Sequence, residues 1–186
     1  LKEGPLYSLG PLIHNPAEVD RLQQLGLVTL DQDQIERDGN WEILRSKRIL
    51  IRSHGVSPET ESRVRQAARE VLDATCPRVH QLQDRVAKAA AQGYQVLMFG
   101  KKDHPEVRGL SGYSRDQGLL IEDGTDLNTV TIQAPAVLIS QTTMPEDRFR
   151  AVAHALKQRS DGIEVQDTLC RAILHRQTRI QEFARS

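Results

Sequence analysis

Short apolar segments alternate with segments of helical periodicity along most of this chain, and no other feature restricts its fold as much. Five apolar runs are predicted to be strands: residues 6–9, 49–51, 96–99, 119–121 and 136–139. Apolar residues recur at spacings of three and four in five predicted helices: residues 18–25, 59–68, 79–91, 148–156 and 172–183. Because strands and helices take turns, we predict βαβ units, which means an α/β fold with parallel sheets flanked by helices.

The length of 186 residues allows one large domain or two compact lobes of about 90 residues each. Cys76 and Pro77 separate two of the predicted helices, and proline favours a boundary at such a point. We therefore predict a first α/β lobe over residues 1–75 and a second over residues 76–167. Residues 31–45 show the weakest pattern and are predicted to be loop with a short helix.

The composition disfavours two classes of partner. Basic and acidic residues each number 25 and only 4% of residues are aromatic, so the chain lacks the basic surface and stacking groups of a nucleic-acid binder. No apolar run approaches the length of about 20 residues that crosses a bilayer, and no charged and apolar leader precedes the first predicted strand. We expect a cytoplasmic protein that binds neither nucleic acid nor membrane.

The same junction recurs after three of the predicted strands. His14 follows the run 6–9, His54 follows 49–51 and His104 follows 96–99. Within a few residues each histidine is followed by proline and then glutamate, which suits a helix start because proline fits the first helical position and acids favour the first turn. The sequence thus predicts three histidines at three strand-to-helix turns.

Such turns are where open parallel sheets bind ligands, and helix N-termini offer free N–H donors to anions. Three imidazoles converging there would suit a phosphate or diphosphate, since histidine can supply a donor or a positive charge near neutral pH. Taken singly, each junction can equally be an ordinary helix start. A metal site of three histidines is a further alternative, but it has less support because no two are spaced four apart on a helix.

Two junctions carry a thiol, and one carries hydroxyl and amide groups. Cys76 and Cys170 both precede a predicted helix, and they lie 94 positions apart (170 − 76), which excludes a CxxC motif. A thiol at a helix start is a suitable metal ligand, although either cysteine alone can also be a buried structural thiol. Gln141, Thr142 and Thr143 follow the run 136–139 and lead into Pro145 and Glu146.

Taken together and in order, these segments resemble the LytB/IspH family. Six segments carry the resemblance: Gly10-Pro11-Leu12-Ile13-His14-Asn15-Pro16, Ser53-His54-Gly55-Val56-Ser57, Asp73-Ala74-Thr75-Cys76-Pro77, Gly100-Lys101-Lys102-Asp103-His104-Pro105-Glu106-Val107, Ser140-Gln141-Thr142-Thr143 and Asp167-Thr168-Leu169-Cys170. Each segment alone would be weak evidence. Six in the family's order, spread over nearly the whole chain, are specific.

The resemblance implies a three-lobed, pseudo-symmetric α/β protein with a central [4Fe-4S] cluster held by three cysteines. Cys76 and Cys170 would be two of these ligands, and the third would lie outside this chain, in a segment before the first motif. Residues 168–186 would begin a third lobe that is truncated here. We therefore expect this segment to be inactive when it is isolated.

The resemblance also implies an oxidoreductase that removes the hydroxyl of 4-hydroxy-3-methylbut-2-enyl diphosphate and yields isopentenyl and dimethylallyl diphosphate in the methylerythritol phosphate pathway. A donor such as ferredoxin or flavodoxin would supply the electrons. His14, His54, His104, Gln141 and Thr143 would bind the substrate. Glu106 would deliver protons, with Thr142 orienting it, which is reasonable because a carboxyl group beside an anion keeps its proton longer.

One residue departs from the family pattern. Ile173 stands where the family has threonine, while Arg176 and Gln177 are kept. Isoleucine cannot donate the hydrogen bond of a threonine, so a divergent paralogue or a non-catalytic module that binds a phosphorylated ligand remains the alternative function. A plain α/β domain whose motifs are only helix caps would not explain the order of the six segments.

Overall fold

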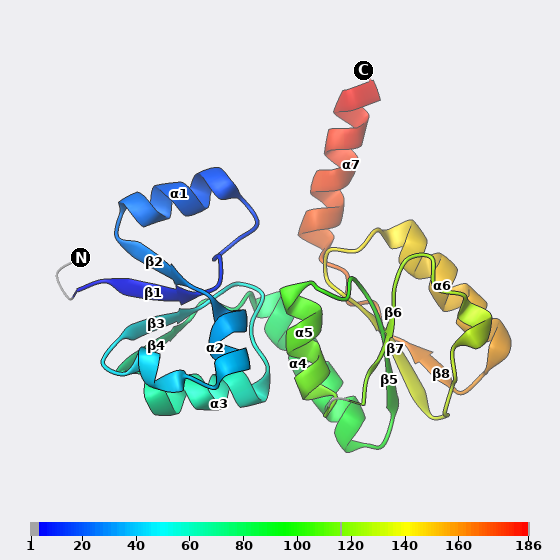
Figure 1. The fold of residues 1–186 in the computed structure, drawn as a ribbon. Helices are drawn as coiled ribbons and strands as arrows, with labels where there is room; N and C mark the ends of the chain where they lie inside the picture. Colours follow the sequence, from blue (N-terminus) through cyan, green and yellow to red (C-terminus); the bar gives the residue numbers. More distant parts are fainter. Residues whose placement is uncertain (1–3, 116, 186) are drawn as a thin grey trace. The chain divides into compact units, whose positions relative to one another are not determined.

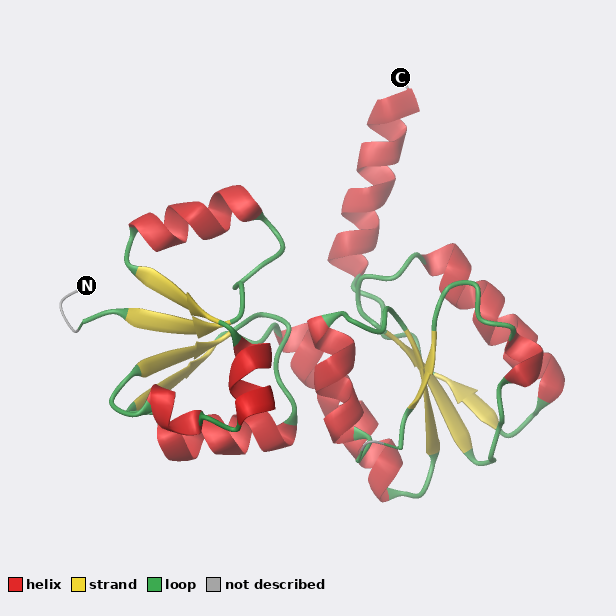
Figure 2. Cartoon of the chain, in the orientation of Figure 1, coloured by secondary structure: helices red, strands yellow, loops and turns green. Residues whose placement is uncertain are grey.

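The structure is a computed structural model that describes residues 4–115 and 117–185, and the chain divides into two compact units, Leu1–His80 and Gln81–Ser186. Each unit contains one four-stranded parallel sheet with helices beside it, as predicted (Figures 1 and 2). The predicted lobe boundary between residues 75 and 76 and the predicted third lobe from residue 168 stay predictions. The outermost ends of these predicted lobes, residues 1–3 and 186, lie outside the described residues.

The first unit contains β1 (Leu6–Leu9), α1 (Pro16–Gln24), β2 (Leu27–Leu30), α2 (Gln32–Asp38), the 3-10 helix η1 (Trp41–Leu44), β3 (Arg48–Ile51), α3 (Pro58–Ala67) and β4 (Glu70–Asp73). The strands lie in the order β2-β1-β3-β4, and all neighbours are parallel. Residues 31–45, predicted as loop with a short helix, contain α2 and η1.

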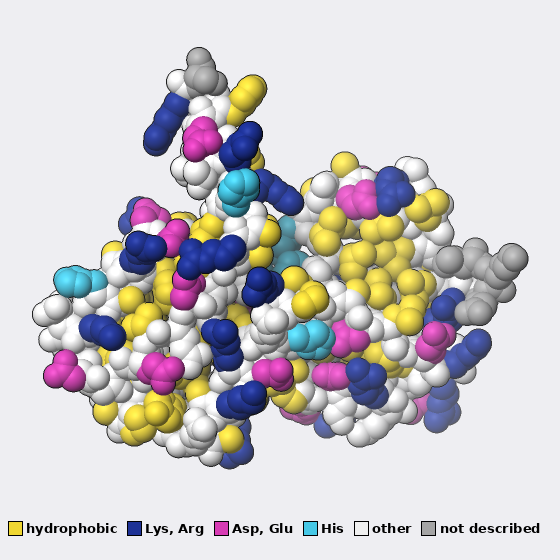
Figure 3. All heavy atoms as spheres, turned by 180° about the vertical axis from the view of Figure 1, so that it is seen from behind, with side chains coloured by type: hydrophobic (Ala, Val, Ile, Leu, Met, Phe, Trp, Pro, Cys, Tyr) yellow, Lys and Arg dark blue, Asp and Glu magenta, His cyan; other side chains and the backbone are white. Residues whose placement is uncertain are grey.

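The core of the first unit lies on one face of its sheet. Leu9 and Ile49 from the strands pack there with Ile35 of α2, Leu44 of η1 and Val64 of α3. On the opposite face Leu72 keeps 36% of its surface exposed. Figure 3 shows hydrophobic side chains gathered over this sheet in the view from behind.

The second unit contains most of α4 (Pro77–Ala91), then β5 (Gln95–Phe99), α5 (Pro105–Tyr113), β6 (Leu119–Ile121), the 3-10 helix η2 (Leu127–Thr129), β7 (Ala136–Ser140), α6 (Glu146–Arg159), β8 (Ile163–Val165) and α7 (Arg171–Arg185). The strands lie in the order β6-β5-β7-β8. Within the described residues, no helix is both long enough and apolar enough to cross a membrane.

The central strands of the second unit are buried on both faces. Leu97 and Phe99 of β5 pack in one cluster with Phe149 of α6. Their neighbours Val96 and Met98 point to the other face, into a second cluster that contains Leu82, Val86 and Ala89 of α4 and Leu110 of α5. The sheet is therefore the middle of three layers (Figure 1), and its turns are anchored on a packed core.

Three strands escaped the sequence prediction, and all three lie at the edge of a sheet. β2 and β4 are the edge strands of the first sheet, and β8 is one of the two edge strands of the second. They have three or four residues each and are only partly buried. Because an edge strand packs on fewer neighbours, its sequence carries less apolar signal than a central strand.

Candidate functional site

Both units have the same strand order, with the first strand of each unit beside the third. The chain leaves the first strand toward one edge and returns over it to the other side, so β1 and β3, like β5 and β7, flank a topological switch point. Open α/β sheets bind ligands outside the carboxyl ends of the strands at this point. His14 and His54 follow β1 and β3, whereas Glu106 and Thr142 follow β5 and β7. Residues predicted for the site therefore occupy the switch point of each unit.

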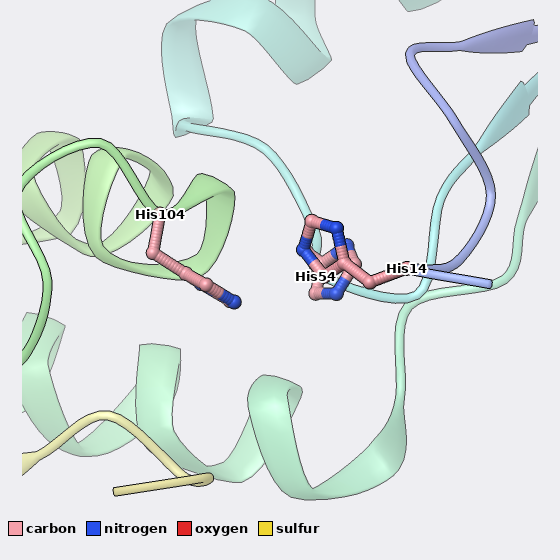
Figure 4. Close-up of side chains that lie close together, drawn as sticks. All are labelled: His14, His54 and His104. Atoms are coloured by element: carbon pink, nitrogen blue, oxygen red, sulfur yellow. The ribbon is translucent and has the colours of Figure 1, made fainter. Parts of the chain in front are cut away.

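In the first unit the structure brings His14 and His54 together. Their ring centroids lie 4.5 Å apart, and the ring planes are tilted by 41°. His14 is exposed and His54 is half-buried. Figure 4 shows the two rings side by side, each reaching out from its own turn, and both can offer ring nitrogens to an anion.

Ser53 holds the three turns of the first unit together. Its hydroxyl donates a hydrogen bond to the carbonyl of Leu12 at 3.0 Å, which ties it to the turn of His14. Its own carbonyl accepts the N–H of Cys76 at 2.9 Å. His14, His54 and Cys76 thus lie on loops joined through one residue.

Cys76 is a half-buried free thiol directly before α4. Asp73 shapes the preceding turn by accepting the N–H of Thr75 at 2.8 Å, and it pairs with Nε2 of His80 at 3.2 Å. Partial burial alone would raise the pKa of Asp73, but the hydrogen bonds from Thr75 and the charges of His80 and Arg65 hold it below its usual value. An ionised Asp73 therefore keeps the cysteine loop in shape.

In the second unit the structure joins Glu106 to Thr142. Glu106 lies in the first turn of α5 with only 2% of its surface exposed. One carboxyl oxygen accepts the N–H of Thr142 at 2.7 Å, and the other accepts its hydroxyl at 2.8 Å. Burial raises the pKa of Glu106, while the two hydrogen bonds from Thr142 partly oppose the shift. A buried carboxyl group with a raised pKa can hold a proton and release it to a neighbour.

His104 caps the N-terminus of α5, because its Nδ1 accepts the N–H of Glu106 at 3.2 Å. The residue therefore has a local structural role besides the predicted contact with substrate. Figure 4 also shows its ring at the start of this helix.

Gln141 and Thr143 belong to the turn after β7. Gln141 is buried, with its side-chain oxygen accepting the N–H of Lys101 at 3.1 Å and its amide donating to the Thr143 hydroxyl at 2.8 Å. A Cβ added at Gly100 would lie 2.7 Å from Val107 and 3.1 Å from the Cβ of Gln141, so only glycine lets these two turns approach so closely. Gln141 thereby braces the turns, while Thr143 is exposed to solvent.

Cys170 is the second half-buried free thiol, and it lies directly before α7. Its N–H donates to the carbonyl of Thr142 at 2.7 Å. The backbone of Cys170 therefore lies beside the turn that contains Thr142, the hydrogen-bond partner of Glu106. The preceding Leu169 is buried in the core of the unit and anchors the loop.

The two thiols occupy equivalent places in their units, and this was not recognised from the sequence. Asp73-Ala74-Thr75-Cys76 begins at the last residue of β4, and Asp167-Thr168-Leu169-Cys170 begins two residues after the end of β8. Asp167 accepts the N–H of Leu169 at 3.2 Å, as Asp73 accepts that of Thr75. The spacing Asp-x-x-Cys after an edge strand was the signal that could have revealed the repeat.

The two thiols fit the donor set of an iron-sulfur cluster. Both are free, half-buried and placed at a helix start, and clusters are held by cysteine thiolates. These 186 residues contain two cysteines, fewer than the four thiolates that hold a [4Fe-4S] cluster of the usual kind. Ser53, Asp73 and Thr168, which shape the two cysteine loops, were not singled out from the sequence.

The chain is similar in sequence to one family of known proteins. The model of the LytB protein family matches residues 1–186. The 4-hydroxy-3-methylbut-2-enyl diphosphate reductase of Parabacteroides distasonis is 37% identical over 97% of this chain and 63% of its own length. The enzyme of the same name from Aquifex aeolicus is 33% identical over 98% of this chain and 61% of its own length. The chain therefore spans less than two thirds of these relatives.

Two solved structures have a similar fold. The E-1-hydroxy-2-methyl-but-2-enyl-4-diphosphate reductase from Plasmodium falciparum matches with a TM-score of 0.84 over 95% of this chain and 54% of its own; at 23% identity this shows the fold alone. An (E)-4-hydroxy-3-methyl-but-2-enyl diphosphate reductase, the terminal enzyme of the non-mevalonate pathway, matches with a TM-score of 0.73 and 33% identity. That match covers 91% of this chain and 59% of the other.

Proposed function

Because the chain belongs to the LytB protein family, we propose that it carries the central residues of an oxidoreductase that converts 4-hydroxy-3-methylbut-2-enyl diphosphate to isopentenyl and dimethylallyl diphosphate. In this reaction the carbon–oxygen bond of the hydroxyl group breaks and two electrons enter the allyl skeleton. One proton leaves with the hydroxyl as water, and a second joins carbon. The protein must therefore bind a diphosphate, supply protons and accept electrons from a donor such as ferredoxin or flavodoxin.

The observation that carries the proposal is the buried pair of Glu106 and Thr142. A carboxyl group that is 2% exposed and has a raised pKa holds a proton at a higher pH than an exposed glutamate. Thr142 fixes both carboxyl oxygens from one residue. In our proposal Glu106 delivers the proton and Thr142 orients it.

The diphosphate would be bound by His14, His54 and His104, helped by Gln141 and Thr143. The close approach of the His14 and His54 rings supports this role for the first unit, because neighbouring imidazoles can donate to neighbouring phosphate oxygens. In the second unit the N-terminus of α5 adds a helix dipole that favours an anion.

Cys76 and Cys170 would be two of three thiolate ligands of a [4Fe-4S] cluster, with the third cysteine outside these 186 residues. When bound, such a cluster would pass on the two electrons of the reduction one at a time, as it receives them from the donor. Ser53 and Asp73 would hold the loop of Cys76, and Thr142 and Leu169 would hold that of Cys170.

The test uses the full-length protein that contains this chain, prepared without oxygen. We expect visible iron-sulfur absorption, and consumption of 4-hydroxy-3-methylbut-2-enyl diphosphate with a fast electron donor. Glu106→Gln should lower kcat by about 10²-fold or more and leave KM and iron content nearly unchanged, the usual scale for losing a positioned general acid.

Glu146→Gln is the matched control, because Glu146 is also a first-turn acid after a central strand but is partly exposed and paired with Arg150. It should keep wild-type turnover. A Glu106→Gln variant that keeps most of its activity would remove Glu106 from the chemistry. A colourless protein that binds the diphosphate without turning it over would favour the non-catalytic module.

A further inference from the structure

The segment before Cys170 continues the β7–β8 pairing beyond the end of β8. The regular ladder ends with the Gln166 N–H donating to the Leu138 carbonyl at 2.9 Å. Four residues further on, the Cys170 N–H donates to the Thr142 carbonyl at 2.7 Å. Positions 138 and 166 are as far apart along the chain as positions 142 and 170, so the two segments keep the register of the ladder.

Between these two contacts, the side chain of Thr168 takes the place of backbone. Its hydroxyl accepts the N–H of Ser140 at 2.8 Å and donates to the carbonyl of the same residue at 2.7 Å. In a regular parallel pair, backbone groups of the neighbouring strand would make both contacts. One hydroxyl can do so because it has one donor and two acceptor sites. Ser140 is fully buried, so its backbone groups need these partners.

The first unit shows the same step without a hydroxyl. Ala74 occupies the position equivalent to Thr168, two residues before the cysteine, and its own N–H donates directly to the carbonyl of Ile51 at 3.0 Å. A hydroxyl between two segments sets them further apart than a direct backbone contact does. The second unit therefore has a side-chain hydroxyl as a spacer at this position, and the first unit has a direct backbone contact there.

We propose that Thr168 is a positioning residue that sets the place of Cys170 relative to Thr142, and through Thr142 the place of Glu106. The inference rests on the proposed function, in which Cys170 is a thiolate ligand and Glu106 the proton donor. Thr168 touches neither group directly. It acts through Ser140, which directly precedes the turn of Gln141 and Thr142, and through the loop that ends at Cys170.

The test compares Thr168→Ala and Thr168→Ser in the full-length protein. Alanine removes the spacer, and the first unit shows that this fold accepts alanine at the equivalent position. Amide hydrogen exchange at Cys170 should become about 10-fold faster or more in the alanine variant, since local opening governs exchange. In the loaded enzyme kcat should fall by about 10-fold or more with KM within about 2-fold, because small misplacements weaken chemistry more than binding.

Serine keeps the hydroxyl and should restore the exchange rate and kcat together. Thr129→Ala is the matched control, because the exposed Thr129 hydroxyl donates to the Asp126 carbonyl at 2.8 Å, away from the ladder. An alanine variant at position 168 with wild-type exchange and kcat, a serine variant as impaired as alanine, or an equal loss in Thr129→Ala would each overturn the inference. Absence of turnover in the wild-type protein would instead contradict the proposed function, and the exchange comparison does not depend on it.

Discussion

At the scale of the residue, two opposing effects act on the pKa of Glu106. Removing a carboxylate from water disfavours its charged form, whereas hydrogen bonds from the N–H and hydroxyl of Thr142 favour it. Burial is the larger effect, so the pKa of Glu106 is raised. The first-turn acid Glu146 shows the opposite result: its hydrogen bond with Arg150 is the main cause that lowers its pKa.

The raised pKa predicts how stability changes with pH. The folded protein holds the Glu106 proton more tightly than the unfolded chain, so this group favours folding below the ordinary glutamate pKa of about 4.3, and the contribution is lost as pH rises through the folded-state value. Glu106→Gln has no such proton. The free energy of unfolding of the variant, relative to wild type, should therefore increase as pH rises above about 4.3.

Urea unfolding of both proteins over a pH series would measure this difference. Other titrating groups are common to both proteins and cancel. Glu146→Gln is again the control, and its difference from wild type should change in the opposite direction, because the folded state of the wild type favours the ionised Glu146. A pH-independent difference for Glu106→Gln would show that burial does not govern its protonation.

At the scale of the element, the helices after three of the four central strands begin with a polar cap, whereas α6, after β7, follows Pro145 and has no side-chain cap. Asn15 and Ser57 accept backbone N–H groups at the starts of α1 and α3, and the His104 imidazole does so at the start of α5. Besides the Nδ1 that accepts the backbone N–H, an imidazole has a second ring nitrogen, Nε2, that can also form a hydrogen bond. The cap of α5 therefore also carries a group suited to binding an anion.

Two substitutions separate these roles of His104. His104→Ala should lower the stability of the protein by about 1 kcal/mol through loss of the cap and should raise KM for the diphosphate. His104→Asn retains a side-chain acceptor, so we expect near wild-type stability but a KM still raised about 10-fold, the loss of one hydrogen bond to a charged group. Thermal unfolding and steady-state kinetics would measure the two effects. If asparagine restores KM as well, His104 is only a cap.

At the scale of the whole molecule, one topology is used twice. Each unit has its first and third strands at the centre of the sheet, a residue predicted for the site after each of these strands, and an Asp-x-x-Cys segment at or just beyond the end of the fourth strand. The two units differ in the residues at their switch points. The first carries paired histidines at its switch point, and the second carries the buried carboxyl group.

The number of cysteines predicts the behaviour of the 186-residue chain in isolation. Two thiolates leave two irons of a [4Fe-4S] cluster without a protein thiolate, whereas such clusters are normally held by three or four cysteines. After reconstitution with iron and sulfide without oxygen, we expect a nearly colourless protein with little bound iron. The full-length protein treated in the same way is the positive control. Recovery of a complete, substrate-responsive cluster from the short chain would contradict the proposed ligand set.

Local sequence determined the elements whose signals are local. The central strands β5 and β7 of the second unit read as apolar runs because both of their faces are buried. Pro-Glu pairs marked helix starts because proline fits the first helical position and acids favour the first turn. From these turns and their order we could predict the family, and also that the three histidines and two cysteines lie just before helices.

Only the tertiary structure decided how the turns are held. The edge strands β2, β4 and β8 became visible through pairing, since a strand with few buried neighbours has a weak pattern of its own. The contacts of Ser53 with Leu12 and Cys76, and of Thr168 with Ser140, join segments that are far apart along the chain. No local sequence pattern indicates which distant residue a hydroxyl will contact. The burial that raises the pKa of Glu106 exists only once the core has formed around it.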